Sequence, residues 1–243
     1  ILGLFLGVPL IAKEYQDDTV ELAWTQTITR RKWLRAKLAW ALSAAAVSGA
    51  IITVLITWWS QTENAIGFSR FAPPNFDVQG LMPVVYAVLA VALGAAIGAW
   101  FKKVLLAMAV TLFAFVAFQV VIASFVRPHY EAPLKQTQTF NMFHSAQNGV
   151  SVSLGLPNSG HGTWMFRQQF IQPEITTTPQ KINSTCRALP VNTTNPKCVA
   201  TNITTYQPAN HYWPFQFIEA AIYLALTAIA VAATYLFVLK RDA

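Results

Sequence analysis

The stretch LMPVVYAVLAVALGAAIGAWFKKVLLAMAVTLFAFVAFQVVIASFV (residues 81–126) decides the fold class of this chain. It contains two apolar runs, 81–101 and 104–126, which lack Asp, Glu, Lys and Arg and are separated by Lys102-Lys103. Each run is long enough to cross a bilayer, because a membrane-spanning helix needs about 20 apolar residues. The stretch therefore predicts two membrane-spanning helices joined by a short basic turn.

Two further runs, 38–59 and 214–239, are equally long and apolar, and the second contains one acidic residue, Glu219. Residues 1–12 are apolar but too short to span, so we expect them to be the end of a span that begins upstream. Only 11% of the residues are charged, against about 25% in a soluble domain. We therefore predict an all-α polytopic membrane protein and exclude a cytosolic globular protein, a disordered chain and a coiled coil.

The distribution of Lys and Arg predicts the orientation in the membrane. Residues 13–37 carry six basic residues, whereas loop 60–80 carries only Arg70. The formal net charge of +7 follows these loops and does not indicate a nucleic-acid partner. We expect loop 60–80 to be a short outer connection without chemistry of its own. The predicted cytoplasmic parts are residues 13–37, 102–103 and 240–243, and the predicted extracytoplasmic parts are 60–80 and 127–213.

The long outer segment, 127–213, is rich in Thr, Asn, Gln and Pro and lacks helical periodicity. Residues 150–154 and 163–166 have the composition of short β-strands. The segment also contains the two cysteines of the chain, Cys186 and Cys198. Because disulfides persist in oxidising compartments, we predict a small extracytoplasmic domain of loops and strands, held by one disulfide.

The first cytoplasmic segment contains Asp18 and Glu21 at capping-box spacing, which predicts a short helix there. A second helix would follow and continue into the first complete span. Trp24 and Trp33 allow two interpretations. They fit the aromatic belt of a juxtamembrane anchor, and they also fit a docking helix for a cytoplasmic partner, because Trp and Arg anchor many interfaces.

Three stretches resemble one family of membrane proteins. Gly7-Val-Pro-Leu-Ile-Ala-Lys-Glu14, followed by residues 19–33, resembles actinobacterial-type ABC transporter permeases and, more loosely, type-2 ABC exporter permeases in general. Arg127-Pro-His-Tyr130 and residues 206–219 resemble the same family, in the same order. Asp18 departs from the pattern, because the family usually has Gly at that position.

The resemblance implies a six-span permease fold, in which the four complete runs are the third to sixth spans and the first span and most of the second are missing. In this family the loop after the second span holds a coupling helix that sits in a groove of a separate ATPase subunit. The implied partners are that ATPase, which binds ATP and Mg²⁺, a second permease copy and the lipid bilayer. The candidate docking residues are Val20, Ala23, Trp24, Thr25, Gln26, Arg30, Arg31 and Trp33.

Two other features allow more than one interpretation. Glu219 is either a carboxylate that water reaches in the first turns of its helix or a polar contact that lines an outer gate or pins the edge of the outer domain. Gln119 is a weaker case of the same kind. Gly94 and Gly98 form a G-x-x-x-G pattern that lets two helix backbones approach closely. The close contact lies either within the chain or with a second permease copy.

No nucleotide-binding G-x-x-x-x-G-K-[ST] pattern and no common hydrolase, redox or metal-ligand pattern occurs in the sequence. We therefore expect no catalytic site, metal or cofactor on this chain.

The predicted function is the permease subunit of an ATP-driven exporter in the cell membrane, which moves a small or amphiphilic substrate outward by alternating access. The alternative is a membrane-anchored receptor or sensor that acts through its extracytoplasmic domain. The predicted parts are 1–12 (end of a span), 13–37 (coupling segment), 38–126 (three spans), 127–213 (extracytoplasmic domain) and 214–243 (last span and tail).

Overall fold

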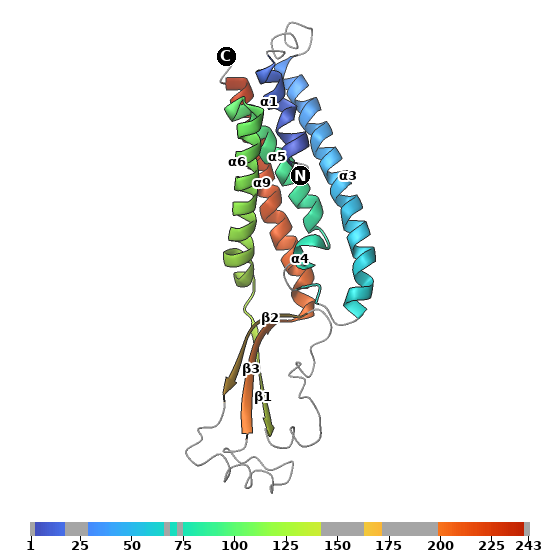
Figure 1. The fold of residues 1–243 in the computed structure, drawn as a ribbon, viewed down its shortest axis with the longest axis vertical. Coiled ribbons are helices and arrows are strands. Elements are labelled where there is room, and N and C mark those ends of the chain that lie inside the picture. Colours follow the sequence, from blue (N-terminus) through green and yellow to red (C-terminus); the bar gives the residue numbers. More distant parts are fainter. Residues whose placement is uncertain are drawn as a thin grey trace. The chain divides into compact units, whose positions relative to one another are not determined.

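The computed structural model describes residues 3–17, 29–65, 69–71, 75–141, 163–171 and 199–240. The chain divides into two compact units. The helical unit comprises Ile1–Ile66, Pro73–Glu131 and Tyr212–Ala243, and the strand unit comprises Gly67–Ala72 and Ala132–His211. Each unit is described separately below, with the labels of Figure 1.

Four helices of the helical unit are long and apolar enough to cross a membrane, as predicted. These spans are Arg30–Gln61, Met82–Phe101, Val104–His129 and Ala209–Leu239. The first begins at Arg30 and not at residue 38, because the helix predicted for the basic segment continues directly into the apolar run, as expected. The elements of the unit are η1 (Gly3–Gly7), α1 (Pro9–Gln16), α3 (Arg30–Ala65), α4 (Asn75–Val78), α5 (Met82–Phe101), α6 (Val104–Val121), η2 (Ile122–Val126), η3 (Arg127–His129) and α9 (Tyr212–Lys240).

Helix α5 lies at the centre of the helical unit (Figure 1). It packs against η1, α1, α3, α6 and α9. Half of its apolar window, 50%, is buried inside the unit, against 17% for α3 and 17% for α6. Because α3 and α6 leave most of their apolar side chains exposed, we expect lipid to cover their outer faces.

The G-x-x-x-G pattern of α5 faces η1 and α1 within the same chain. A Cβ atom at Gly94 would lie 2.5 Å from the backbone oxygen of Gly3, and one at Gly98 would lie 2.9 Å from the backbone oxygen of Val8. Both distances are shorter than real Cβ contacts, so only glycine permits this approach. The structure therefore places both glycines at an intrachain contact, which is one of the two arrangements that the sequence left open.

One end of the helical unit carries most of its basic residues, and we call it the basic end. These residues include Lys13, Arg30, Arg31, Lys37, Lys102 and Lys103. Here α1, α3, α5 and α9 converge on a small apolar cluster that includes Ile11, Leu34, Ala99 and Val238. The turn between α5 and α6 lies at the same end, where Lys102 adopts a left-handed backbone conformation (φ 56°) and its N–H donates to Gly98 O at 3.0 Å. This hydrogen bond closes the C-terminus of α5 and lets α6 begin two residues later.

The described part of the strand unit contains a three-stranded antiparallel sheet in the order β1-β3-β2. The strands are β1 (Leu134–Asn141), β2 (Trp164–Ile171) and β3 (Val199–Gln207), with Leu134 opposite Tyr206 and Trp164 opposite Gln207. Strand β2 includes most of the predicted strand at 163–166. The predicted strand at 150–154 lies outside the described residues. Cys186 and Cys198 also lie outside them, so the disulfide stays a prediction.

Candidate functional site

A cluster of charged side chains lies in the helical unit, at the end of the spans opposite the basic end. Arg127 comes from η3 at the end of the α6 span, Glu219 from the early part of α9, and Asp77 from α4. The guanidinium Nε donates to Glu219 Oε2 at 2.8 Å and Nη2 donates to Glu219 Oε1 at 2.7 Å. Nη2 also pairs with Asp77 Oδ1. One guanidinium therefore binds two carboxylates from separate elements.

The cluster is buried and its formal charges do not balance. The side chain of Arg127 is 1% exposed and that of Glu219 is 0% exposed, whereas that of Asp77 is 21% exposed. Among the described residues, Arg127 is the one cation within ion-pair distance of these carboxylates. Two carboxylates and one guanidinium give the cluster a formal charge of −1. Such charges are costly in an apolar environment unless they are paired, so the pairing largely determines how this end packs.

Tyr86 on α5 connects the two carboxylates. Its hydroxyl oxygen lies 2.9 Å from Asp77 Oδ1 and 2.9 Å from Glu219 Oε1, and its single proton can be donated to either. The Tyr86 ring packs against Tyr223 of α9 with centroids 4.7 Å apart. The hydroxyl of Tyr223 in turn donates to Gln119 Oε1 of α6 at 3.4 Å, a long hydrogen bond. Gln119 is thus linked to the cluster through two tyrosines.

Gln216 on α9 fixes the segment that carries Asp77. Its Oε1 accepts a hydrogen bond from the N–H of Leu81 at 2.9 Å, and its Nε2 lies 3.2 Å from Phe76 O and 3.3 Å from Gln79 O. The central carbon of the Arg127 guanidinium lies over the Phe76 ring, 4.4 Å from the ring centroid, as a cation–π contact. Since Gln216 is fully buried, one amide joins the turn between α4 and α5 to α9 and places Asp77 beside Arg127.

The structure excludes one of the two interpretations of Glu219 and corrects one prediction about this end. Glu219 is not a carboxylate that water reaches, because it is fully buried and paired with Arg127. Loop 60–80 was expected to contribute no chemistry, yet it supplies Asp77 to the cluster. Arg127 stood out in the sequence only as part of a family pattern, and Tyr86 was missed. The available signal was that Asp77, Arg127 and Glu219 all lie close to the predicted outer ends of spans.

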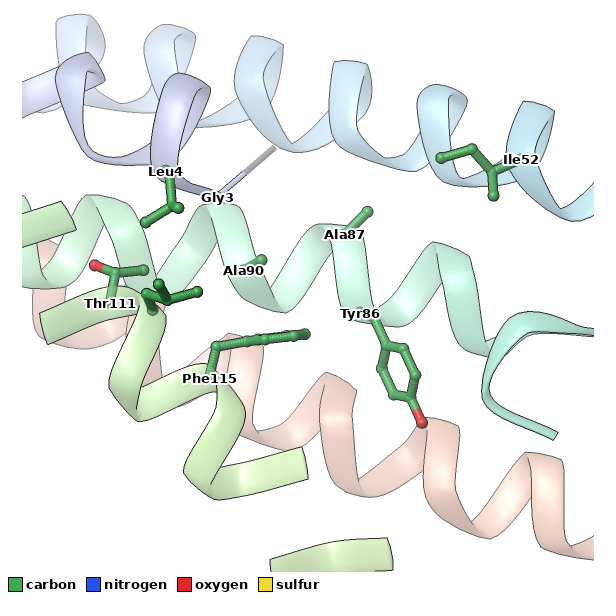
Figure 2. A pocket seen from close by; sticks show the side chains of 9 residues that line it. Gly3, Leu4, Ile52, Tyr86, Ala87, Ala90, Thr111 and Phe115 are labelled. Carbon is green, nitrogen blue, oxygen red and sulfur yellow. The ribbon is translucent and has the colours of Figure 1, made fainter. Parts of the chain in front are cut away.

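An apolar pocket adjoins the cluster at Tyr86. It has a volume of about 330 Å³ and is lined by side chains of η1, α3, α5 and α6 (Figure 2). Leu4, Ile52, Leu112 and Phe115 contribute to its walls. Tyr86 therefore lines the pocket and also joins the charge cluster through its hydroxyl.

At the basic end, three consecutive residues of α1 each contact a different partner. Glu14 forms an ion pair with Lys37 of α3. Tyr15 lies under the ammonium group of Lys102, 4.5 Å from the ring centroid. The Oε1 of Gln16 accepts a hydrogen bond from the backbone N–H of Val104, the first residue of α6, at 3.1 Å. We call Glu14, Tyr15 and Gln16 the α1 anchor.

The predicted docking residues follow the α1 anchor in the sequence. Val20, Ala23, Trp24, Thr25 and Gln26 are outside the described residues. Arg30 and Arg31 are in the first turn of α3. Trp33 is partly buried against the apolar cluster of the basic end, and the Lys37 ammonium lies 4.5 Å from its ring centroid. Trp33 thus contacts its own helical unit, and the docking role of all eight residues, Trp33 included, stays a prediction.

These features define the class of the protein. It is a multi-pass membrane protein with four candidate spans, a buried charge cluster at one end of them and a firmly held α1 terminus at the other. A family model described as ABC-2 membrane transporter related matches residues 1–127, and the chain belongs to this family. The match ends at Arg127 and covers the described elements from η1 to η2. No match was found among curated proteins or among solved structures.

The family match confirms the predicted resemblance to ABC transporter permeases, because it supports an ABC-2 type permease. It supports a membrane subunit without a catalytic site of its own that works with an ABC ATPase subunit. The finer resemblance to actinobacterial-type permeases stays a prediction.

Proposed function

We propose that this chain is the permease subunit of an ATP-driven ABC exporter, which docks its ATPase through the segment after Gln16 and exports an amphiphilic substrate by alternating access. The native assembly holds two permease chains and two ATPase chains. The basic end faces the cytoplasm, and residues 127–213 lie outside the cell. Family membership supports the ATPase partnership, and the distribution of basic residues supports the orientation.

The α1 anchor is the observation that carries this proposal. A docking segment can drive transport only if its movement reaches the spans. Glu14 holds α3, while Tyr15 and Gln16 hold Lys102 and Val104 at the junction of α5 and α6. A push on the residues that follow Gln16 would therefore act on several spans at once. A receptor that signals through its outer domain has no need of such a connection at the basic end.

Two variants test the proposal at successive steps. Trp24→Ala should weaken ATPase association, because a buried Trp anchor typically contributes about 2 kcal/mol or more to an interface. Gln16→Ala should leave association intact but lower the amount of substrate transported per ATP hydrolysed. The matched control is Gln61→Ala, which changes the same residue type on an exposed position near the other end of α3.

The measurements are pull-down of the ATPase and substrate-stimulated ATP hydrolysis and transport by the complex in liposomes. If Trp24→Ala binds the ATPase as tightly as the unmutated chain, the docking assignment is wrong and Trp24 is a membrane anchor. If Gln16→Ala and Gln61→Ala transport equally well per ATP, the α1 anchor does not transmit the movement.

A further inference from the structure

We propose that the charge cluster is a gate at the end of the spans opposite the basic end. In the closed state its ion pairs hold Arg127 against α9 and keep η2 in the π-helical form. When the pairs break, η2 rewinds as an α-helix and turns η3 away from α9. The inference assigns a gate to the proposed exporter and in that respect rests on the proposed function, whereas the device itself is argued from contacts within the helical unit.

The helix that carries Arg127 changes its hydrogen-bond pattern just before this residue. Helix α6 ends at Val121, and the next five residues, Ile122–Val126, form the π-helix η2. The N–H of Arg127 donates to Ile122 O, five residues earlier, whereas an α-helix joins residues four apart. This turn therefore contains one residue more than an α-helical turn. Single π-helical turns of this kind are rare and often lie at functional sites.

The extra residue determines the direction in which Arg127 points. Each residue of an α-helix adds about 100° of rotation and about 1.5 Å of rise. If η2 rewound as an α-helix, the residues that follow would turn by about 100° and move about 1.5 Å along the axis. The guanidinium would then no longer face Glu219, so the π-helical form and the ion pairs occur together.

Long side chains join the segment beyond η2 to α9. η2 and η3 pack closely against α6 and against each other, and none of these three is among the described elements that pack closely with α9. Arg127 makes two hydrogen bonds to Glu219, at 2.8 and 2.7 Å, and the ring centroids of Tyr130 and Phe215 lie 5.2 Å apart. Such contacts can separate without repacking an interface between helices.

The closed state needs an outside source of energy to open. The side chains of Arg127 and Glu219 are 1% and 0% exposed. Separating them leaves each buried charge without its partner until water or a new partner reaches it, which is strongly unfavourable. In the proposed exporter, binding of ATP to the ATPase supplies this energy.

Tyr86 connects the gate to α5. Its hydroxyl lies 2.9 Å from Asp77 Oδ1 and 2.9 Å from Glu219 Oε1, the same two oxygens that Arg127 Nη2 contacts. Figure 2 shows this hydroxyl directed towards α9. Since α5 extends to the basic end, where the α1 anchor contacts the residue that follows it, a shift of α5 would carry movement from the basic end to the gate.

The test measures the distance between η3 and α9 by double electron–electron resonance. The sample is the purified full chain in nanodiscs, without the ATPase and with its two native cysteines replaced by Ser. Spin labels are attached to exposed positions through His129→Cys and Phe217→Cys. A control pair near the basic end uses Leu105→Cys and Leu236→Cys, which are also exposed.

Arg127→Gln should change the distance between the labels at His129 and Phe217 by roughly 5 Å, the order of displacement that a turn of about 100° gives on a helix surface. The control distance should stay the same. If this variant does not fold, Arg127→Met together with Glu219→Met replaces it, because apolar replacement of both partners of a buried ion pair is often nearly neutral. An unchanged distance in a folded variant would overturn the proposal.

Deletion of Ser124 separates the rewinding of η2 from simple loss of the ion pairs. Ser124 is exposed, and without it the segment from Ile122 to Arg127 has the length of an α-helical turn. Arg127 should then still face Glu219, so the shortened chain should show the closed distance. Adding Arg127→Gln to the deletion should no longer change the distance. A change as large as that of Arg127→Gln alone would mean that η2 does not rewind.

The gate and the exporter give distinct outcomes, because the first measurements are made without the ATPase. In the complex, ATP bound to an ATPase variant that cannot hydrolyse it should produce the open distance. Deletion of Ser124 should abolish transport and leave ATPase association intact. If Arg127→Gln opens the isolated chain and ATP leaves the distance in the complex unchanged, the gate stands and ATP-driven opening is contradicted.

Discussion

Arg127 is held by two carboxylates that are far away in the sequence. Asp77 lies 50 residues before it and Glu219 lies 92 residues after it. In a buried environment each of these ions is stable only because the others are present. Removing the cation and removing one carboxylate should therefore have unequal effects, since the first leaves two like charges and the second leaves a balanced pair.

We predict that Arg127→Gln lowers the free energy of unfolding by about 3–5 kcal/mol, the range for removing one partner of a buried ion pair. Glu219→Gln should cost clearly less, because Arg127 keeps Asp77 as its partner. Thermal unfolding of the two variants in the same detergent measures the difference. A Glu219→Gln variant as unstable as Arg127→Gln, or less stable, would contradict the charge count of the cluster.

At the scale of elements, the helical unit depends on small residues along α5. The backbone of η1 approaches α5 so closely that a methyl group at Gly94 would lie 2.5 Å from Gly3 O. A rigid backbone atom cannot move aside as a flexible side chain can, so any larger residue must separate the two elements.

We predict that Gly94→Val lowers the free energy of unfolding by about 1–3 kcal/mol, the usual cost of overpacking. The matched control is Ala109→Val on the exposed side of α6, where the added methyl groups face outward and should be nearly neutral. Thermal unfolding in detergent measures both variants. If Gly94→Val is as stable as Ala109→Val, the contact between η1 and α5 is not tight in solution.

The sequence predicts the spans well and the charge cluster poorly, for one physical reason. A span is a local property, since about 20 consecutive apolar residues suffice to cross the bilayer. The run at 81–101 accordingly differs by one residue from helix Met82–Phe101. The cluster is non-local, because its carboxylates come from opposite directions along the chain and Tyr86 looks like any aromatic residue of an apolar helix. Only the packing of α4, α5, η3 and α9 brings them together.

At the scale of the whole molecule, the two ends of the helical unit have different roles in our account. We expect the basic end to receive the movement of the ATPase through the α1 anchor, whereas the ion pairs of Arg127 hold the opposite end together. Helix α5 extends between these ends and packs against α3, α6 and α9, the other long helices described in the unit. We therefore expect α5 to be the most direct connection between nucleotide-driven movement and the charge cluster.

The central claim is that this chain acts only together with a separate ABC ATPase. The measurement that tests it most directly is the mass of the native complex, solubilised in mild detergent from cells that express the full chain at its natural level. We predict a particle that contains two copies of this chain and two copies of an ATPase. A stable particle that lacks an ATPase and still transports substrate would contradict the account.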